Sequence, residues 1–229
     1  IESNKFYENA NEILKETPPK PNLEQQNAIL TISNCHGFNT FLLNGITGSG
    51  KTEVYLRVIE NVLKEGKAVL ILVPEIALTP QTFDRFYRRF NVPVSSMHSA
   101  LSDRERLDAY IDMATSKSGI LIGTRTALFT PIPNLGLIVI DEEHDSSFKQ
   151  NDSFRYHARN LAIMRAKLNN CPIVLGSATP SLETIYNVQK GVYQKIDLTI
   201  RAGGATVPNF ELIDLRNEPL TDGLKTGIC

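Results

Sequence analysis

A glycine-rich segment in the first quarter of the chain reads Gly45-Ile46-Thr47-Gly48-Ser49-Gly50-Lys51-Thr52. It follows the apolar run 41–43 and opens a segment with helical periodicity, in which one face carries Tyr55, Val58, Ile59, Val62 and Leu63. A strand, a glycine-rich turn and a helix in this order make the pattern G-x-x-x-x-G-K-[ST] a credible phosphate-binding loop. The alternative is an ordinary glycine turn before a helix, which this context makes the weaker interpretation.

Each residue type in this segment suits the binding of phosphate. Glycines let successive backbone N–H groups turn inward around an anion, because they carry no Cβ. The helix behind them presents unpaired N–H groups and the positive end of its dipole. Lys51 would bring a mobile charge to the β- and γ-phosphates, and Thr52 a hydroxyl to Mg²⁺. The segment therefore predicts that Gly45 to Thr52 bind a nucleoside triphosphate.

Length and composition favour one large α/β domain. The chain has 229 residues, 41% of them hydrophobic, and its net charge of −1 lacks the basic character of many nucleic-acid binders. Cys35, Cys171 and Cys229 form no C-x-x-C pair, which indicates a reducing compartment and no zinc site. No apolar run approaches the roughly 18 residues of a membrane span, and no signal-like segment opens the chain. We expect a cytoplasmic protein without a membrane contact, excised from a longer one.

Strands and helices alternate along the chain, which predicts an open, largely parallel sheet with helices on both faces. The expected strands are 41–43, 68–73, 92–97, 119–122, 135–140, 172–176, 193–198 and 210–215. The expected helices are 23–32, the segment from the phosphate loop to Gly66, 79–90, 102–114, 157–168 and 179–189. Such sheets bind ligands beyond the carboxyl ends of their strands.

Three parts are expected along the chain. Residues 1–22 end in a proline-rich segment typical of an extended linker, and residues 23–198 form the nucleotide-binding lobe. Residues 199–229 contain a hinge at 202–204 and lead toward a second lobe. Within the helix 79–90, we expect a core face and a solvated face. The core face is Phe83, Phe86, Tyr87 and Phe90, and the solvated face is Arg85, Arg88 and Arg89.

A second motif follows the apolar run 137–140 and reads Asp141-Glu142-Glu143-His144. A strand would deliver Asp141 at its end, where it can hold Mg²⁺ directly or through water. Glu142 is then placed to orient and deprotonate the attacking water. The alternative is a strand followed by a solvated acidic turn. Paired with the phosphate loop, the motif predicts Lys51, Asp141 and Glu142 as the catalytic residues.

Several blocks together resemble a known family. The acidic motif follows the D-E-x-H pattern of superfamily-two helicases, and Gly176-Ser177-Ala178-Thr179-Pro180 resembles their Ser-Ala-Thr motif. The further matching blocks are 48–55, 73–81, 123–129, 141–149 with 155–159, and 177–184. In this order they resemble the first motor lobe of the bacterial replication-restart DNA helicases, the primosomal protein N′ family, over about residues 23–215. The resemblance implies a RecA-like lobe that couples ATP hydrolysis, with Mg²⁺, to DNA unwinding.

The resemblance also implies roles for single residues. Gln25 lines up with the glutamine that reads adenine in these helicases, with an exposed helix glutamine as the alternative. Thr124 and Arg125 would contact the DNA backbone, although an internal salt bridge is nearly as good an account of Arg125. Ser177 and Thr179 would couple the nucleotide site to DNA movement. The implied partners are single-stranded and forked or branched DNA, other primosome proteins and single-strand binding protein.

The segment 148–157 resembles the aromatic-rich loop of the family. Aromatic side chains interleaved with cations suit the stacking of single-stranded bases beside phosphate contacts. The candidates for DNA contact are Phe148, Lys149, Phe154, Arg155 and Tyr156. The alternative is that the aromatic residues simply pack under the next helix.

Three other functions compete with this interpretation. One is another superfamily-two motor, such as a repair translocase, against which the aromatic loop and the block 123–129 argue. A second is a signalling GTPase, which should carry an N-K-x-D motif that this sequence lacks. The third is a nucleotide-binding module that is inactive alone, because helicases of this type complete their site with arginines from a second lobe.

Overall fold

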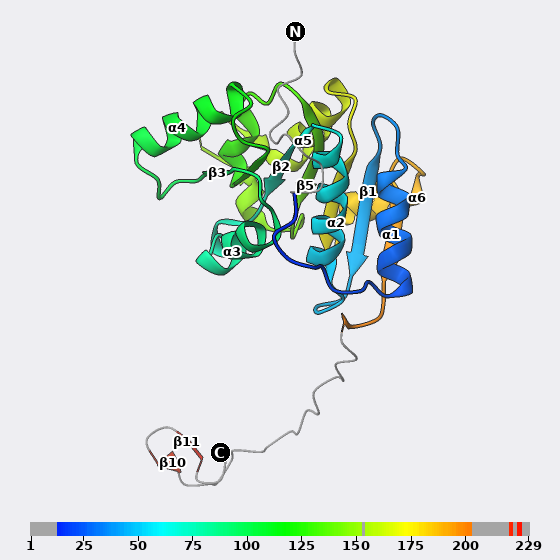
Figure 1. The fold of residues 1–229 in the computed structure, drawn as a ribbon. Coiled ribbons are helices and arrows are strands. Elements are labelled where there is room, and N and C mark those ends of the chain that lie inside the picture. Colours follow the sequence, from blue (N-terminus) through cyan, green and yellow to red (C-terminus); the bar gives the residue numbers. More distant parts are fainter. Residues whose placement is uncertain (1–12, 153, 203–219, 222–223, 226–229) are drawn as a thin grey trace.

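One parallel sheet runs through the part of the chain that the computed structural model describes, which is residues 13–152, 154–202, 220–221 and 224–225 (Figure 1). Seven strands lie in the order β3-β4-β2-β5-β8-β1-β9, and every neighbouring pair is parallel. Their bounds are β1 Thr40–Gly45, β2 Ala68–Leu72, β3 Val94–Met97, β4 Ile120–Gly123, β5 Leu135–Ile140, β8 Ile173–Ser177 and β9 Gln194–Leu198. Short antiparallel pairs are β6 (Lys149–Gln150) with β7 (Tyr156–His157), and β10 (Leu220–Thr221) with β11 (Leu224–Lys225). The expected parallel α/β sheet is confirmed.

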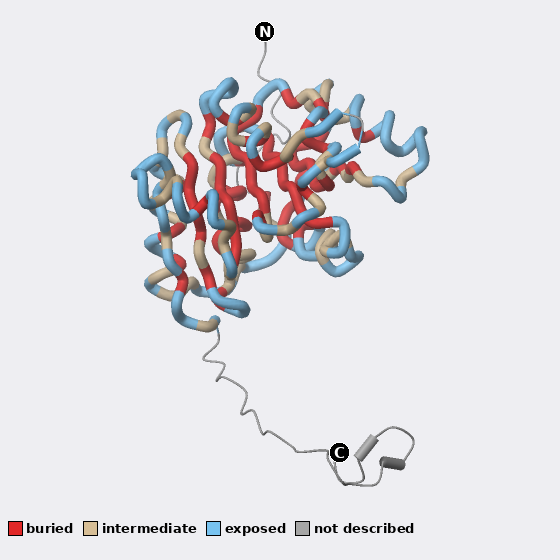
Figure 2. Tube along the Cα trace, turned by 180° about the vertical axis from the view of Figure 1, so that it is seen from behind, coloured by how far each residue is buried: buried red, intermediate tan, exposed pale blue. Residues whose placement is uncertain are grey.

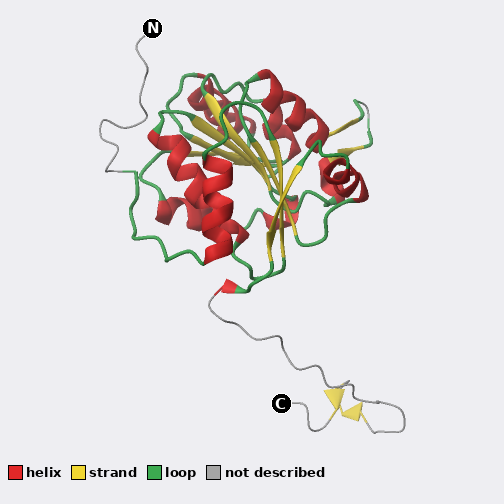
Figure 3. Cartoon of the chain, turned by 90° about the vertical axis from the view of Figure 1, so that its right-hand side faces the viewer, coloured by secondary structure: helices red, strands yellow, loops and turns green. Residues whose placement is uncertain are grey.

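Helices cover both faces of the large sheet, as the side view in Figure 3 shows. They are α1 Leu23–Ser33, α2 Lys51–Lys64, α3 Pro80–Arg89, α4 Asp103–Ala114, α5 Ala158–Leu168 and α6 Leu182–Gln189, with short 3-10 turns η2 Glu75–Ala77, η3 Arg125–Phe129 and η4 Ser146–Phe148. Along β2, Val69 and Ile71 belong to a core with α1, α2 and α3, whereas Leu70 and Leu72 belong to a second core with α4 and α5. Successive strand side chains point to opposite faces, so the two cores lie on opposite sides of the sheet.

Strands β5, β8 and β1 are neighbours in the sheet, and β5 is its middle strand. Every residue of β5 and β8 is buried, and Figure 2 shows buried strands running through the interior of the sheet. Strands covered on both faces need continuous apolar runs, which 135–140 and 173–175 supply. Because parallel strands end at the same edge, the segments that follow β1, β5 and β8 meet there.

Most helices begin where the sequence predicts. Ser102 caps α4 in a capping box with Glu105, and the hydroxyl of Thr79 caps α3. Helix α6 is an exception to the expected start at Thr179. Its N-cap is Ser181, whose hydroxyl accepts the N–H of Thr184, so the helix starts at Leu182.

The charged side of α3 differs from the expected solvated face at one position. Arg85 and Arg88 are exposed, but Arg89 is only 3% exposed and bonds both carboxylate oxygens of Glu53 in α2, at 3.0 and 2.6 Å. Helical spacing places Arg89 on a face, but it does not reveal that a carboxylate of another helix lies opposite. The expected aromatic core face divides as well, since Phe86 and Phe90 are buried, Phe83 is half-buried and Tyr87 is exposed.

The end of the expected linker packs against the lobe. Ile13 is buried in the core shared with α3, its carbonyl accepts the N–H of Asn91 at 2.7 Å, and the N–H of Lys15 reaches the carbonyl of Arg89 at 3.0 Å. Residues 1–12, hinge positions 203–204 and the strand expected at 210–215 lie outside the described residues. Among the helices that are described, none is both long enough and apolar enough to cross a bilayer.

Candidate nucleotide-binding and hydrolysis site

The turn after β1 has the backbone shape of an anion cradle. Gly48 and Gly50 have φ angles of 80° and 84°, in the left-handed region that other residues rarely adopt. A Cβ at Gly50 would overlap with the side-chain amide of Gln25. Backbone conformation at both positions, and close packing at the second, therefore require the glycines of the pattern.

Helix α2 opens on this turn without a side-chain cap. Its N-cap is Gly50, which has no side chain to accept the first N–H groups of the helix. The Oγ of Ser49 beside it is buried and has no hydrogen-bond partner among the described residues. Unpaired donors at a helix N-terminus suit a phosphate group. The turn therefore fits the nucleoside phosphate that the sequence predicts.

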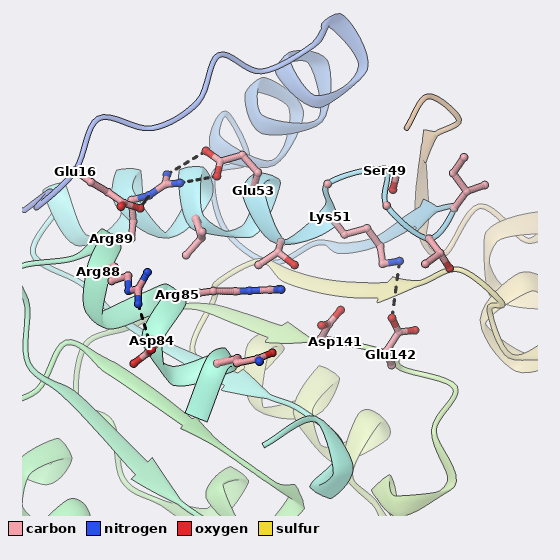
Figure 4. Close-up of a pocket in the computed structure, with 17 residues that line it drawn as sticks. Glu16, Ser49, Lys51, Glu53, Asp84, Arg85, Arg88, Arg89, Asp141 and Glu142 are labelled. Carbon is pink, nitrogen blue, oxygen red and sulfur yellow. Dashed lines mark hydrogen bonds and ion pairs between the residues drawn. The ribbon is translucent and has the colours of Figure 1, made fainter. Parts of the chain in front are cut away.

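The phosphate loop opens into a pocket of about 860 Å³ between α2, α3 and the end of β5 (Figure 4). Residues 46–52 of the predicted loop line it, together with Asp141 and Glu142. Gly45 is not one of the lining residues. Its carbonyl accepts a hydrogen bond from the Nζ of Lys51 at 3.0 Å. The same Nζ lies 3.8 Å from Oε1 of Glu142, and Figure 4 shows the two side chains pointing toward each other. The structure thus brings the three predicted catalytic residues into one cavity.

Asp141 directly follows β5 and is held by α2. The hydroxyl of Tyr55 donates to its Oδ1 at 3.0 Å. Burial, and then the charge of Glu142, raises the pKa of the Asp141 carboxyl. Burial and the neighbouring Asp141 raise the pKa of Tyr55 well above its ordinary value, so the phenol remains a donor. Thr52 and Asp141 line the same pocket with oxygen atoms, the ligands that Mg²⁺ prefers, so this donor set fits the ion.

Glu142 occupies an unusual backbone conformation. Its φ is 49°, in the left-handed region, which costs a residue with a Cβ roughly 1–2 kcal/mol. Strain of this kind concentrates at functional sites. The conformation leaves the carboxylate between Lys51 and the Nδ1 of His144, which lies 3.7 Å from Oε2. The strained backbone thus belongs to the residue that the sequence predicts as the base.

Gln25 packs against the phosphate loop, and its role in reading adenine stays a prediction. It is 4% exposed, its Nε2 donates to the carbonyl of Ser49 at 2.9 Å, and its Oε1 accepts the N–H of Asn22 at 3.0 Å. The amide is therefore engaged by the phosphate loop and the helix cap, so the alternative of an exposed helix glutamine is wrong. Its neighbour Gln26 is exposed. In this arrangement Gln25 positions the phosphate loop, which sequence spacing does not reveal.

Two side chains of the acidic turn contact residues that no local sequence pattern connects to the turn. The Nδ1 of His144 pairs with the Oγ of Ser177 at 2.8 Å, and Ser177 is fully buried. Glu143, also fully buried, accepts from Arg159 at 2.7 Å and from the N–H of Ser181 at 2.7 Å. The partners are far apart in sequence, so local spacing gives no signal for them. A third acidic residue after a buried strand is the feature that could have suggested a buried ion pair.

The candidates for DNA contact on the aromatic segment separate into a core residue and surface residues. Phe148 is 1% exposed and belongs to the second core, so its assignment to base stacking does not hold in this structure. Phe154 is 70% exposed, Tyr156 is half-buried, and their ring centroids are 5.7 Å apart. Lys149 and Arg155 are exposed, as stacking beside phosphates requires. Residues 149–151 and 155–157 line a surface pocket of about 540 Å³.

The other residues predicted to contact DNA, or to couple its movement to the nucleotide site, lie at or just after the ends of β4 and β8. Thr124 is buried at the end of β4, and Arg125 donates to the carbonyl of Ser147 at 2.8 Å. Arg125 thus bonds a backbone carbonyl in place of the internal salt bridge that was the alternative to DNA contact. Thr179 is exposed, and its N–H donates to Ser177 at 3.0 Å. Buried Thr124 can reach a ligand only through a change in structure, whereas Thr179 is accessible.

The fold and the site define a RecA-like P-loop lobe. Comparison with known families agrees, because the pattern of the DEAD/DEAH box helicases matches residues 22–188. The chain belongs to this family and is built as a helicase motor lobe.

Among curated relatives, the chain is similar to the replication restart protein PriA. Identity is 56% over 188 residues with the protein of Haemophilus influenzae and 46% over 210 residues with that of Bacillus subtilis. These matches take in 82% and 90% of this chain but 26% of each relative, so the chain spans about a quarter of their length. The resemblance to replication-restart helicases is confirmed.

Solved structures share the fold at lower identity. The Hef helicase domain of Pyrococcus furiosus matches with a TM-score of 0.60 at 21% identity, over 84% of this chain and 40% of that one. RecG bound to a three-way DNA junction matches with a TM-score of 0.61 at 22% identity, over 82% of this chain and 25% of that one. These matches confirm the RecA-like fold.

Proposed function

We propose that this chain binds ATP with Mg²⁺ at the phosphate loop and serves as the first motor lobe of a helicase that couples ATP hydrolysis to DNA unwinding in replication restart. The observation that carries the proposal is the single pocket shared by Lys51, Thr52, Asp141 and Glu142. The curated relatives that are named replication restart proteins support the biological setting.

The four side chains have distinct tasks in this proposal. Lys51 moves from Gly45 and Glu142 to the β- and γ-phosphates, which frees the Glu142 carboxylate. That carboxylate takes the proton of the water that attacks the γ-phosphorus, while the bond from phosphorus to the leaving oxygen of ADP breaks. Thr52 and Asp141 would hold Mg²⁺, which supplies positive charge for the phosphate oxygens.

DNA contact is proposed for the exposed part of the aromatic segment and its neighbours. Phe154 and Tyr156 offer rings for stacking, and Lys149 and Arg155 offer cations for phosphates. Arg125 and Thr179 lie on the segments after β4 and β8. The proposed partners are single-stranded and forked or branched DNA, with primosome proteins and single-strand binding protein in the cytoplasm.

The proposal is tested by two substitutions that should fail differently. Lys51→Ala removes a charge from the bound phosphates and should weaken ATP binding. Glu142→Gln preserves shape but removes the base, so ATP should still bind while hydrolysis falls ~10²-fold or more. Binding is measured by titration of the 229-residue chain, and single-turnover hydrolysis is measured in a full-length protein that carries this lobe.

The full-length protein is needed because an arginine from a second lobe can be worth ~10³-fold or more in phosphoryl transfer. We expect the 229-residue chain alone to show little or no DNA-stimulated hydrolysis. Normal turnover by the Glu142 variant would remove the assignment of the base. Failure of the unmodified chain to bind ATP would overturn the proposed function itself.

A further inference from the structure

Tyr55 stands out because its hydroxyl reaches Asp141, a residue that lines the nucleotide pocket, from the interior. The ring belongs to the core beneath α2 and is 3% exposed. Phenylalanine would fill this space equally well, so packing alone gives no reason for the hydroxyl. The hydrogen-bond partner of that hydroxyl within the described part of the chain is Oδ1 of Asp141, at 3.0 Å. The phenol therefore links the helix after the phosphate loop to the acidic residue after β5.

Gly176 makes room for this link. A Cβ built at Gly176 would overlap with the Oη of Tyr55, lie 2.8 Å from its Cζ, and lie 3.4 Å from Oδ1 of Asp141. The phenol end thus fills the place where a side chain of β8 would stand. The next residue, Ser177, pairs with His144, and the Gly176 carbonyl accepts the N–H of Glu143 at 3.0 Å. The hydroxyl sits where the loop helix, the acidic turn and the end of β8 meet.

A hydrogen-bond donor matters for Asp141 because its surroundings disfavour the charged form of its carboxyl group. It is largely buried, and the negative charge of Glu142 is adjacent. A donor at 3.0 Å restricts rotation of the carboxylate and stabilises its charge. A hydrogen bond that fixes the orientation of a metal-binding carboxylate also tunes the affinity of the site for the metal.

We propose that Tyr55 is a positioning residue for Mg²⁺ binding: its hydroxyl, seated in the space left by Gly176, orients Asp141 so that this carboxylate can hold the ion with the nucleotide. The proposal rests on the proposed function of the same pocket. Tyr55 and Gly176 share one task in this proposal, although neither residue lines the nucleotide pocket.

The test measures how strongly Mg²⁺ raises affinity for a non-hydrolysable ATP analogue. Tyr55→Phe should bind the analogue normally in EDTA. The Mg²⁺ concentration that gives half of the affinity gain should rise about three- to tenfold, the range expected when one ordinary hydrogen bond is lost. Tyr193→Phe is the matched control, because Tyr193 is half-buried on the second core and its hydroxyl has no partner among the described residues.

Three outcomes of this titration are decisive. An unchanged or lowered Mg²⁺ requirement in Tyr55→Phe, with an unmodified chain that binds the analogue and responds to Mg²⁺, overturns the positioning role and leaves the proposed function intact. Equal loss of binding with and without Mg²⁺ also overturns it, since that result indicates a packing role. An unmodified chain that binds no analogue removes the proposed function and this inference together.

A second measurement needs no nucleotide. Gly176→Ala should lower the melting temperature, because its methyl group collides with the Tyr55 hydroxyl. Combined with Tyr55→Phe, the same substitution should cost less, so the two effects should not add. Full additivity in this double-mutant cycle would show that the hydroxyl does not occupy the space beside β8 and would overturn the proposal.

Discussion

At the scale of single residues, the acidic turn combines a buried carboxylate, a strained one and a paired one. Asp141 is held by Tyr55, Glu143 is neutralised by Arg159, and Glu142 is left in the left-handed region with its carboxylate facing Lys51. In the proposed mechanism, the strained residue Glu142 carries the carboxylate that accepts the proton. Stability is given up here for the geometry of the site.

This strain predicts an order of stability among variants of Glu142. Glu142→Gly should be more stable than Glu142→Ala by roughly 1 kcal/mol, because glycine adopts a φ of 49° without a Cβ penalty. Both variants lose the carboxylate equally, so chemical denaturation isolates the backbone effect. The control is Asp145, whose φ is −63°, where the alanine variant should be the more stable one. An alanine variant at 142 that equals the glycine variant would mean that no strain is stored there.

At the scale of elements, the β6–β7 pair is attached to the lobe at both ends. Phe148 enters the second core just before β6, and Arg159 pairs with Glu143 just after β7. Between these anchors, Lys149, Phe154 and Arg155 remain exposed. Because the β6–β7 pair is fixed at both ends and exposed in its middle, a contact made at its surface can shift the acidic turn through Arg159 and Glu143. The aromatic residues of the segment therefore divide between anchoring and contact.

This division predicts different effects for two phenylalanines. Phe148→Ala should lower the free energy of unfolding by about 3–5 kcal/mol, because it removes a fully buried ring. Phe154→Ala should change it by less than about 0.5 kcal/mol, while DNA binding of a full-length protein weakens by roughly 1–3 kcal/mol. Denaturation and single-stranded DNA titration measure the two quantities.

Phe38→Ala is the control for exposed phenylalanine, since Phe38 precedes β1 at the opposite edge of the sheet. It should affect neither DNA binding nor stability strongly. If Phe154→Ala bound DNA normally, the aromatic segment would lose its proposed role in stacking.

At the scale of the whole molecule, the sheet carries its two cores on opposite faces and its chemistry at one edge. The phosphate loop follows β1, the acidic turn follows β5, and Ser177 ends β8, which lies between them. A nucleotide at this edge would contact several elements of the fold at once. Binding should therefore stabilise the native lobe as a unit.

Mg²⁺ and ATP at 100 times the dissociation constant should stabilise the chain by about 2.7 kcal/mol. For a domain of this size, that corresponds to a rise in melting temperature of roughly 5–10 °C. Lys51→Ala at the same nucleotide concentration should show a much smaller rise. A melting temperature that does not respond to nucleotide in the unmodified chain would contradict binding at this edge.

Local patterns in the sequence were sufficient for the fold class and for the centre of the site. The phosphate loop is recognisable because its eight consecutive residues meet the backbone requirements of a single turn. Two of these requirements are the positive φ angles of Gly48 and Gly50. The strands are recognisable because burial on both faces demands continuous apolar runs. Asp141 and Glu142 could be assigned since they directly follow such a run, and a parallel sheet brings strand ends together.

The tertiary structure alone decided which side chains meet. Gln25 binds Ser49 across 24 positions, Arg89 binds Glu53 across 36, and Tyr55 binds Asp141 across 86. Spacing along one element shows which face a side chain occupies, but the partner on that face is set by how separate elements pack. For this reason the sequence left Arg89 as a solvated cation and Phe148 as a stacking ring. Packing made Arg89 part of a buried ion pair and Phe148 part of the core, and it set Gln25 against the phosphate loop.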